Sequence, residues 1–273
     1  MRITQQYLEK KGREVAKVLK NIPEVRAIVF HGGIAWGTID QHSDIDISVF
    51  CTKMPEIKKR QEIIKQHISN VRFNYDDKPY SEKQDIFYLG NLKNYVGVDY
   101  YTISEMSTIL SKKIKLPGYL AGDHETKKFF AHTWTVKIIW DPDKIVNGWQ
   151  KELKPYFTRF RKRAPLFIHW AKHFTESDRS HFFNRGDYIG IQATANQATE
   201  IYLLGLFLLN NRYLDFSKKV DAKLKNLKYK PKNCGLRLNE SAKLGYDERS
   251  FKRKMKILGA LAEETEPLIK RYM

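Results

Sequence analysis

Two aspartates, Asp44 and Asp46, stand two residues apart in an otherwise apolar stretch of the chain. Side chains on a β-strand alternate between its two faces, so both carboxylates project to one side while Ile45 and Ile47 point into a core. Like charges held that close repel each other, and a bound cation removes the repulsion. We therefore interpret Asp44 and Asp46 as ligands of a Mg²⁺ ion that accompanies a nucleotide.

A third carboxylate, Asp99, stands in the middle of the β-branched and aromatic run Val96–Ile103. We predict that this run is a strand and that it pairs with the strand Asp44–Cys51, which would bring Asp99 to the same point. Three converging carboxylates suit two Mg²⁺ ions, one on a triphosphate and one that lowers the pKa of an attacking hydroxyl group; Mn²⁺ can replace Mg²⁺. The competing interpretation is an ordinary acid on an edge strand.

Two glycines precede the aspartates, directly after the predicted strand Val25–Phe30. They permit a tight turn with exposed backbone N–H groups, and a short helix is expected to begin at Ala35. Backbone donors at the start of a helix hold phosphate oxygens, although a Gly-Gly pair is also common in plain turns. The nucleotide-binding residues expected in this segment are Gly32, Gly33, Thr38 and Ser43.

These motifs together resemble the signature of the DNA polymerase beta nucleotidyltransferase superfamily, in which a glycine followed by serine or glycine precedes a strand with two aspartates. The resemblance covers about residues 25 to 105. Gly33 stands where the commonest version has serine, which keeps the backbone contacts to phosphate but removes a serine contact. The matching residues are Gly32, Gly33, Gly37, Asp44, Asp46 and, as third metal ligand, Asp99.

The remaining chain is similar to the antibiotic-type nucleotidyltransferases, of the aminoglycoside and lincosamide kind, and to their uncharacterised relatives. In these proteins a turn like Asp141–Asp143 leads into a helical domain. The resemblance implies an α/β (α+β) catalytic domain at residues 1–145, with a mixed sheet flanked by helices, and an all-α acceptor-binding domain at residues 146–273. It also implies a general base from the helical domain, for which Glu200 and Asp187 are the candidates.

Glu200 lies in an apolar helical stretch, Gly190–Asn210, where an unpaired carboxylate is unfavourable. It therefore needs either a function or a structural salt bridge. Basic residues that follow this helix are expected to neutralise a triphosphate, although a solvated surface position explains each of them as well. These residues are Lys218, Lys219 and Arg212.

The net charge of +18 is the most unusual bulk property of the 273-residue chain. It favours RNA or another polyanion as a partner, but Lys and Arg are spread along the whole sequence, so a solvated basic surface explains it equally well. The only two cysteines, Cys51 and Cys234, have no partner at metal-site or redox spacing. With no apolar signal segment and no apolar run long enough to cross a bilayer, we expect a cytoplasmic protein without a membrane partner.

The resemblance implies transfer of a nucleoside monophosphate from a Mg²⁺-bound nucleoside triphosphate, with ATP as first candidate, to a hydroxyl group of a small molecule. Pyrophosphate would be released. Two alternatives stay open: an RNA, tRNA or protein acceptor, and an antitoxin-like binding partner that keeps the fold without turnover. A homodimer is compatible with the sequence.

Overall fold

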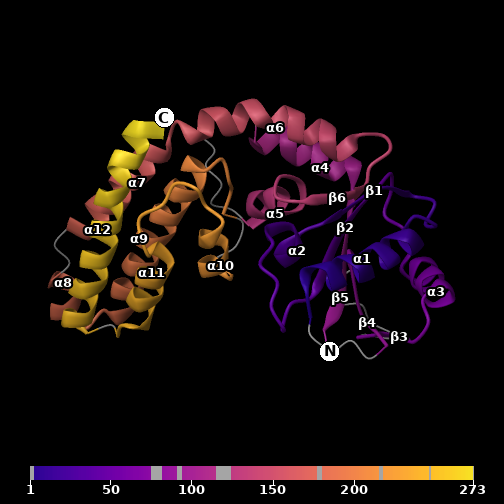
Figure 1. The fold of residues 1–273 in the computed structure, drawn as a ribbon, viewed down its shortest axis with the longest axis horizontal. Coiled ribbons are helices and arrows are strands. Elements are labelled where there is room, and N and C mark those ends of the chain that lie inside the picture. The colour runs from indigo at the N-terminus through magenta and orange to yellow at the C-terminus, as the bar shows by residue number, and fades with distance from the viewer. Residues whose placement is uncertain are drawn as a thin grey trace. The chain divides into compact units, whose positions relative to one another are not determined.

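Six strands form one mixed sheet in the order β3-β4-β5-β2-β1-β6 in the computed structural model of the chain (Figure 1). The structure describes residues 3–74, 82–90, 94–114, 124–176, 180–214, 218–245 and 247–272. Strands β2 and β5 run parallel, and the other neighbouring strands are antiparallel. The strands are β1 (Val25–Phe30), β2 (Ile45–Cys51), β3 (Val71–Phe73), β4 (Gln84–Leu89), β5 (Tyr95–Thr102) and β6 (Lys137–Trp140).

The chain divides into two compact units, Met1–Leu153 and Lys154–Met273, and the division falls within α6. The first unit holds the sheet, the second only helices. Helices of the first unit are α1 (Gln5–Leu19), α2 (Gly32–Trp36), α3 (Ile57–His67), α4 (Ile103–Ile109), the π-helical turn η1 (Leu110–Ile114), α5 (His124–Thr133) and the start of α6 (Ile145–Arg161). The second unit contains α7 (Ala164–Glu176), α8 (Ser180–Asn184), α9 (Tyr188–Leu209), α10 (Val220–Lys225), α11 (Cys234–Lys243) and α12 (Glu248–Tyr272).

One face of the sheet carries the main hydrophobic core of the first unit. On β2 the residues of this face are Ile45, Ile47, Val49 and Cys51, all buried. They share a core cluster with Leu8 and other apolar residues of α1 and with Ile64 of α3. Because side chains alternate along β2, its remaining residues, Asp46, Ser48 and Phe50, point to the opposite face of the sheet.

The opposite face of β2 is apolar at the C-terminal end of the strand only. There Phe50 packs edge-on against Trp149 of α6, with ring centroids 5.1 Å apart, and lies 6.1 Å from the ring of Tyr101 on β5. Phe129 and Phe130 of α5 are also buried. Toward the N-terminal end of β2 the same face bears Ser48 and Asp46.

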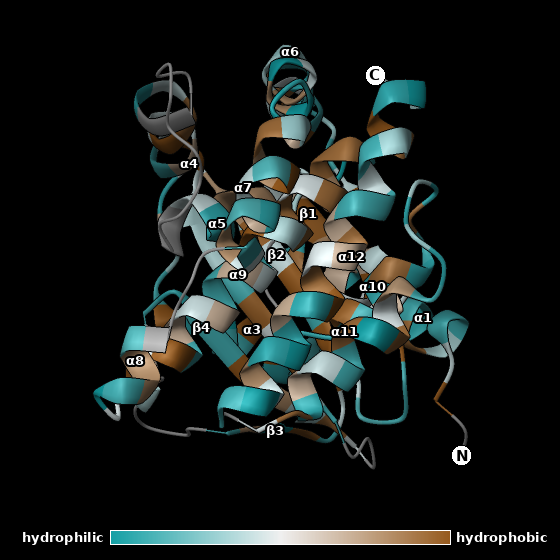
Figure 2. Ribbon diagram, turned by 90° about the vertical axis from the view of Figure 1, so that its left-hand side faces the viewer, coloured by the Kyte–Doolittle hydropathy of each residue, from teal (hydrophilic) through white to brown (hydrophobic). Residues whose placement is uncertain are grey.

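The second unit is a bundle of helices in which α7, α9 and α12 pack against one another. Buried apolar residues of α9 supply much of its core, for example Leu203 and Leu206. Hydrophilic and hydrophobic residues lie side by side around many of the helices, as in amphipathic helices (Figure 2). The predicted fold class is thereby confirmed: a mixed sheet flanked by helices, followed by a helical region.

The predicted elements differ from the observed ones mainly at their ends. Strand β2 begins at Ile45, so Asp44 lies directly before it, whereas the sequence predicted a strand from Asp44. Helix α2 begins at Gly32, so the two glycines form the first turn of the helix and not a turn before it.

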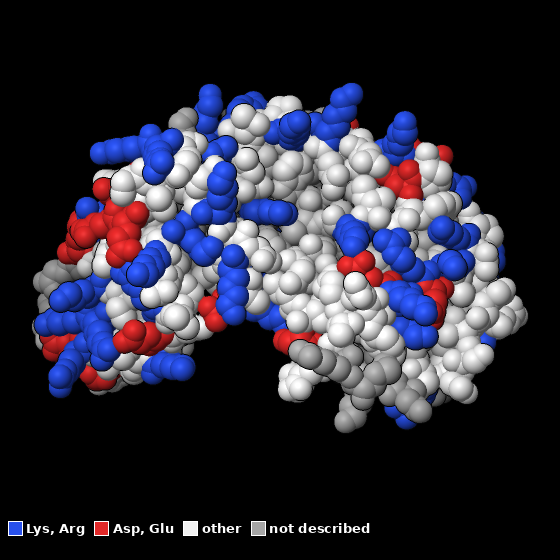
Figure 3. Space-filling view, viewed as in Figure 1, with Lys and Arg blue, Asp and Glu red and all other residues white. Residues whose placement is uncertain are grey.

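Lys and Arg side chains are spread over the visible faces of both units and do not gather into one patch there (Figure 3). This distribution agrees with the scatter of basic residues along the sequence. Within the described residues, no helix combines the length and the apolar character needed to cross a membrane.

A buried ion pair joins α3 to β4. Arg60 and Asp85 are both fully buried, with Nε of Arg60 2.8 Å from Oδ2 of Asp85. The guanidinium also donates to the carbonyl oxygen of Glu82 and lies 4.3 Å from the ring centroid of Tyr100. Burial raises the pKa of Asp85, although the charge of Arg60 beside it acts in the opposite direction. Removing one partner therefore leaves a charge or polar group in the core without compensation.

We predict that Arg60→Met lowers the free energy of unfolding by about 3–5 kcal/mol, because Asp85 is then buried without its cation. The double variant Arg60→Met/Asp85→Leu removes both charges and should recover most of that loss. Urea denaturation of the two variants and the wild type measures both effects. A double variant no more stable than the single one would contradict the prediction.

Candidate functional site

The pairing of β2 with β5 brings polar side chains of both strands onto one face. In this parallel register Asp46 is opposite Gly97, and Ser48 is opposite Asp99. Because side chains two residues apart share a face, Asp46, Ser48 and Asp99 all point away from the core that contains Ile45 and Ile47. The predicted pairing of these two strands is confirmed. It places Asp99 on the strand next to the Asp-Ile-Asp motif.

Two glycines leave room for the carboxylate of Asp46. A Cβ atom on Gly32 would lie 2.2 Å from Oδ2 of Asp46, and one on Gly97 would lie 3.8 Å from Oδ1. Gly32 also has a φ of +59°, a conformation that other residues rarely adopt. A backbone hydrogen bond from the N–H of His31 to the carbonyl oxygen of Asp46, 3.2 Å long, fixes the start of α2 against β2. Asp46 therefore lies against the first turn of α2.

Asp44 and Asp46 share a neighbour in Tyr95, the first residue of β5. Burial raises the pKa of Tyr95 to about 12, and the charge of Asp44, a hydrogen bond from the phenol to Asp44 and the charge of Asp46 act in the same direction. All three side chains are half-buried. The end of β2 and β5 is thus a region of negative charge that water reaches, which suits a cation with oxygen ligands.

Asp99 is held by donors on two other elements. Its Oδ1 accepts a hydrogen bond of 3.0 Å from Nε2 of Gln84 on β4, and its Oδ2 lies 3.3 Å from Nε2 of His31. Burial acts to raise the pKa of Asp99, but the hydrogen bond from His31 and the positive charges near the carboxylate, Lys128 among them, outweigh it, so the pKa is lowered. Asp99 is therefore stabilised as a carboxylate.

His132 of α5 belongs to a buried polar network next to Asp99. Its Nδ1 lies 2.7 Å from Oγ of Ser48, and its Nε2 lies 3.1 Å from the hydroxyl oxygen of Tyr101. Its ring centroid is 4.3 Å from that of His31, with the two rings edge to face. Full burial and the charge of His31 lower the pKa of His132 well below its usual range. His132 is thus a neutral imidazole inside the sheet–helix layer.

His31, Asp99 and His132 each offer one ligand atom, and these atoms lie within 4.8 Å of one another. They are the one group of this compactness among His, Cys, Asp and Glu in the described part of the chain. Asp44, Asp46 and Asp99 do not form such a group, although Asp46 and Asp99 lie on one face of the sheet. The three-carboxylate metal site therefore stays a prediction.

Thr38 and Ser43 lie in the segment that joins α2 to β2, and both are buried. The N–H of Thr38 donates to the carbonyl oxygen of Gly33, and Oγ of Ser43 donates to Oδ1 of Asp40. The N–H of Asp40 in turn donates to Oγ of Ser43. These contacts give Thr38 and Ser43 a structural role in the connection, and their nucleotide contacts stay a prediction.

The candidate residues of the helical unit lie on its surface. Glu200 is exposed on α9, so the expectation that its carboxylate lies in an apolar environment is wrong. Asp187 is the N-cap of α9, where Oδ1 accepts from the N–H of Gly190 at 2.9 Å. Lys218 and Arg212 are exposed, and Lys219 is half-buried. The proposed role of Glu200 as a base now has no support from burial and stays a prediction.

From the sequence, His31 is either a phosphate contact or a plain turn residue, and nothing selects His132, Gln84 or Tyr95. The signal for His132 was a polar ring within the apolar run that includes Phe129, Phe130 and Ala131. The signal for Tyr95 was its place directly before the predicted strand Val96–Ile103. None of these signals names a partner, because the partners are distant in the sequence.

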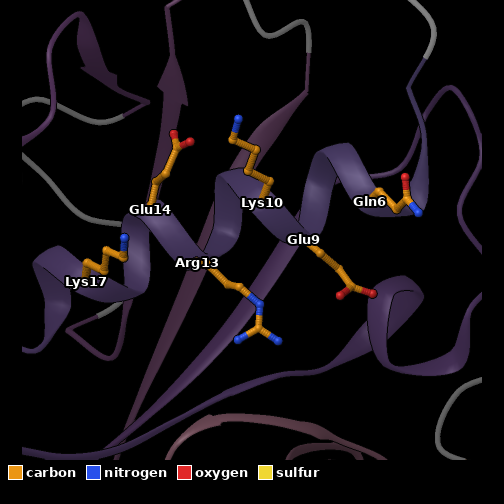
Figure 4. Close-up of a pocket in the computed structure, with 6 residues that line it drawn as sticks. All are labelled: Gln6, Glu9, Lys10, Arg13, Glu14 and Lys17. Carbon is orange, nitrogen blue, oxygen red and sulfur yellow. The ribbon is translucent and has the colours of Figure 1, made fainter.

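A hollow of about 430 Å³ lies along the surface of α1, away from these residues (Figure 4). Its lining comes from successive turns of a single helix and carries both signs of charge. Glu9, for example, pairs with Lys137 and accepts from Gln5, so it has a structural role. The lining residues are Gln6, Glu9, Lys10, Arg13, Glu14 and Lys17. We assign no function to this surface.

No protein-family model matches the sequence, and no curated protein matches it either. Among solved structures, the chain is similar to a nucleotidyltransferase-like protein from Exiguobacterium sibiricum, with 11% identity, a TM-score of 0.35, and 96% of this chain and 74% of that chain covered. It is also similar to a STING-associated CdnE c-di-GMP synthase from Capnocytophaga granulosa, with 12% identity, a TM-score of 0.30, and 98% and 84% covered. Neither similarity is close enough to carry a functional assignment, which rests on the site residues.

Replacing Gly32 tests whether the absence of a side chain at this position makes room for the Asp46 carboxylate. Gly32→Ala should displace the Asp46 carboxylate, because the new Cβ would lie 2.2 Å from Oδ2. Gly37→Ala is the matched control: its φ is +69°, so it has a similar backbone cost of about 1 kcal/mol or more, but no atom lies within 4 Å of its Cβ. We expect Gly32→Ala alone to weaken, by about tenfold or more in calorimetric titrations, the Mg²⁺-dependent ATP binding that is predicted for Asp46. Equal losses in both variants would contradict the prediction.

Protonation of His132 should make the fold acid-sensitive. Its pKa is well below the unfolded value of about 6.5. As the pH falls, this histidine is therefore protonated in the unfolded chain before it is protonated in the folded one. The contribution of the neutral ring to the free energy of unfolding is complete above about pH 6.5, and it decreases as the pH drops toward the pKa of His132 in the folded state. We expect His132→Gln to have a flatter stability profile between pH 7 and 5 in denaturant titrations, by up to about 1.4 kcal/mol per pH unit. Identical slopes would refute this.

Proposed function

We propose that the chain is a metal-dependent nucleotidyltransferase that uses a nucleoside triphosphate as donor, with ATP as the first candidate. The observation that supports this most is the position of Asp46. Its carboxylate lies between Gly32 and Gly97, against the first turn of α2, with Asp44 beside the same tyrosine. A pair of carboxylates next to the N-terminus of a helix suits a divalent cation together with a phosphate chain.

Asp44 and Asp46 would hold the ion that accompanies the triphosphate, and Asp99 would be the third carboxylate. Oxygen ligands at a half-exposed strand end fit Mg²⁺, which keeps several waters and binds few protein carboxylates. The contacts of Asp99 with Gln84 and His31 would adjust when it contributes an oxygen. Asp44, Asp46 and Asp99 would hold an ion whose chemistry, when bound, is to neutralise phosphate charge and lower the pKa of an attacking hydroxyl group.

In the proposed reaction the oxygen of an acceptor hydroxyl group forms a bond to the α-phosphorus, and the bond from that phosphorus to the β-phosphate oxygen breaks. Pyrophosphate leaves, and the hydroxyl proton passes to a base. Gly32 and Gly33 would bring backbone N–H groups of the first turn of α2 to the phosphate oxygens. The roles of Glu200 as base and of Lys218 as a triphosphate contact stay predictions from the sequence.

We propose a small hydroxylated molecule as the acceptor. RNA is the alternative, supported by the net charge of +18, but the basic residues are spread over the surface seen in Figure 3 and mark no single path for a nucleic acid. A binding partner that lacks turnover is the third hypothesis, since carboxylates can persist in such a protein.

The donor half of the proposal is tested by Asp46→Asn. Wild-type protein should bind ATP more tightly when Mg²⁺ is present, and the variant should lose this gain, at least about tenfold in affinity, because a carboxamide cannot neutralise the ion. Asp143→Asn is the matched control, since Asp143 is an exposed aspartate of the same unit, before α6. Calorimetric titration with and without Mg²⁺ measures the gain. If Asp46→Asn keeps it, the enzyme proposal fails.

The acceptor is tested by transfer of label from α-phosphate-labelled ATP to aminoglycosides, lincosamides and tRNA. Labelling of a small molecule that disappears in Asp46→Asn would support the proposal. Labelling of tRNA, with strongly salt-dependent binding, would replace the small acceptor by RNA. A co-purified partner and no labelling of any acceptor would favour the third hypothesis.

A further inference from the structure

We propose that His31, Asp99 and His132 form a binding site for a first-row transition-metal ion, of which Zn²⁺ is the representative. The site would be distinct in its ligands from the carboxylates Asp44 and Asp46. It does not depend on nucleotidyl transfer, because it follows from three side chains that the fold brings together from the residue before α2, from β5 and from α5.

The spacing of the three ligand atoms agrees with one shared ion. They lie within 4.8 Å of one another, and Nε2 of His31 is 3.3 Å from Oδ2 of Asp99. Two ligands about 2.1 Å from a tetrahedral ion lie about 3.4 Å apart, so this pair already has the required separation. A small inward movement of His132 would complete the set.

The types of ligand select the ion. Imidazole nitrogen suits Zn²⁺, copper, iron and nickel, whereas Mg²⁺ and Ca²⁺ prefer oxygen alone. Two imidazoles and one carboxylate are the protein ligands of many catalytic zinc sites, in which a water or substrate takes the fourth position. His31 and Asp99 are partly exposed, with 14% and 16% of their side chains accessible, so the fourth position can open toward water.

Neighbouring side chains hold two of the three ligands in place. Gln84 donates to Oδ1 of Asp99, which leaves Oδ2 toward the histidines. Ser48 contacts Nδ1 of His132 at 2.7 Å, whereas the contact of Tyr101 with Nε2 is longer, at 3.1 Å. We therefore assign Nε2 of His132 as the metal ligand, with Ser48 fixing the ring and the Tyr101 hydroxyl giving way. Such outer contacts typically contribute 10- to 100-fold to metal affinity.

Asp99 is common to this site and to the proposed nucleotide site. A carboxylate can bridge two ions about 3.5–4 Å apart in two-metal sites. Oδ2 of Asp99 lies 3.3 Å from Nε2 of His31, and Oδ1 is held by Gln84 of β4, so sharing Asp99 between two ions would require its carboxylate to give up the contact with Gln84. The two positions would then differ in chemistry: oxygen ligands for Mg²⁺ beside the nucleotide, and imidazole with one carboxylate for a Zn²⁺-type ion behind it.

The experiment is a titration of nucleotide-free, chelator-treated protein with Zn²⁺ by calorimetry and with Co²⁺ by visible absorption. We expect one tight ion per chain. His31→Gln and His132→Gln should each weaken binding at least tenfold, and Ser48→Ala by about 10- to 100-fold. Tyr101→Phe, which removes the competing hydroxyl, should bind as tightly as wild type or more tightly. Asp143→Asn, which changes an exposed aspartate outside both proposed sites, should bind as wild type does.

His31→Gln keeps the test decisive if His132→Gln does not fold, because the His31 side chain makes no capping hydrogen bond to α2. Circular dichroism of each variant checks its fold. Absence of tight Zn²⁺ binding by wild type, or binding that survives His31→Gln and is lost in Asp46→Asn, would overturn the proposal. Since no nucleotide is present, these results are independent of whether the protein transfers nucleotides.

Discussion

The parallel register between β2 and β5 is the constraint on which the candidate site depends. It sets Asp46 opposite Gly97 and Ser48 opposite Asp99. A shift of one residue in either strand would turn its polar side chains into the core and its isoleucines or valines out of it. The buried face, with Ile45, Ile47 and Val98, thus enforces the arrangement of the polar face. The core and the site are two consequences of one pairing.

Much of this arrangement could be predicted from the sequence, because it follows from local periodicity. Two-residue alternation in the segment around Asp46, and the β-branched run around Asp99, are enough to predict two strands and their polar side. The role of the glycines was less predictable. A strand followed by Gly-Gly is compatible with a turn or with the start of a helix, and the choice depends on contacts of Gly32 with Asp46 that no local pattern contains.

The polar network behind Asp99 could not be predicted, because its members meet only in the folded chain. His132 and Ser48 are 84 residues apart in sequence. Gln84 reaches Asp99 from β4, across a strand pairing. In the helical unit the difficulty was different: α9 is apolar along most of its length, and hydropathy alone does not tell which side Glu200 faces. An exposed side of such a helix becomes visible only once its packing partners α7 and α12 are known.

Burial changes along the polar face of β2 and β5, and this change explains why two positions on it carry different chemistry. At one end Phe50 and Trp149 exclude water. In the middle Asp99 lies beside the buried Ser48 and His132, where a carboxylate needs donors, and it has them in Gln84 and His31. At the other end Asp46 lies beside half-exposed residues, where water or a hydrated ion can compensate its charge. A hard, hydrated cation therefore suits the open end, and an ion that binds imidazole and sheds its water suits the interior.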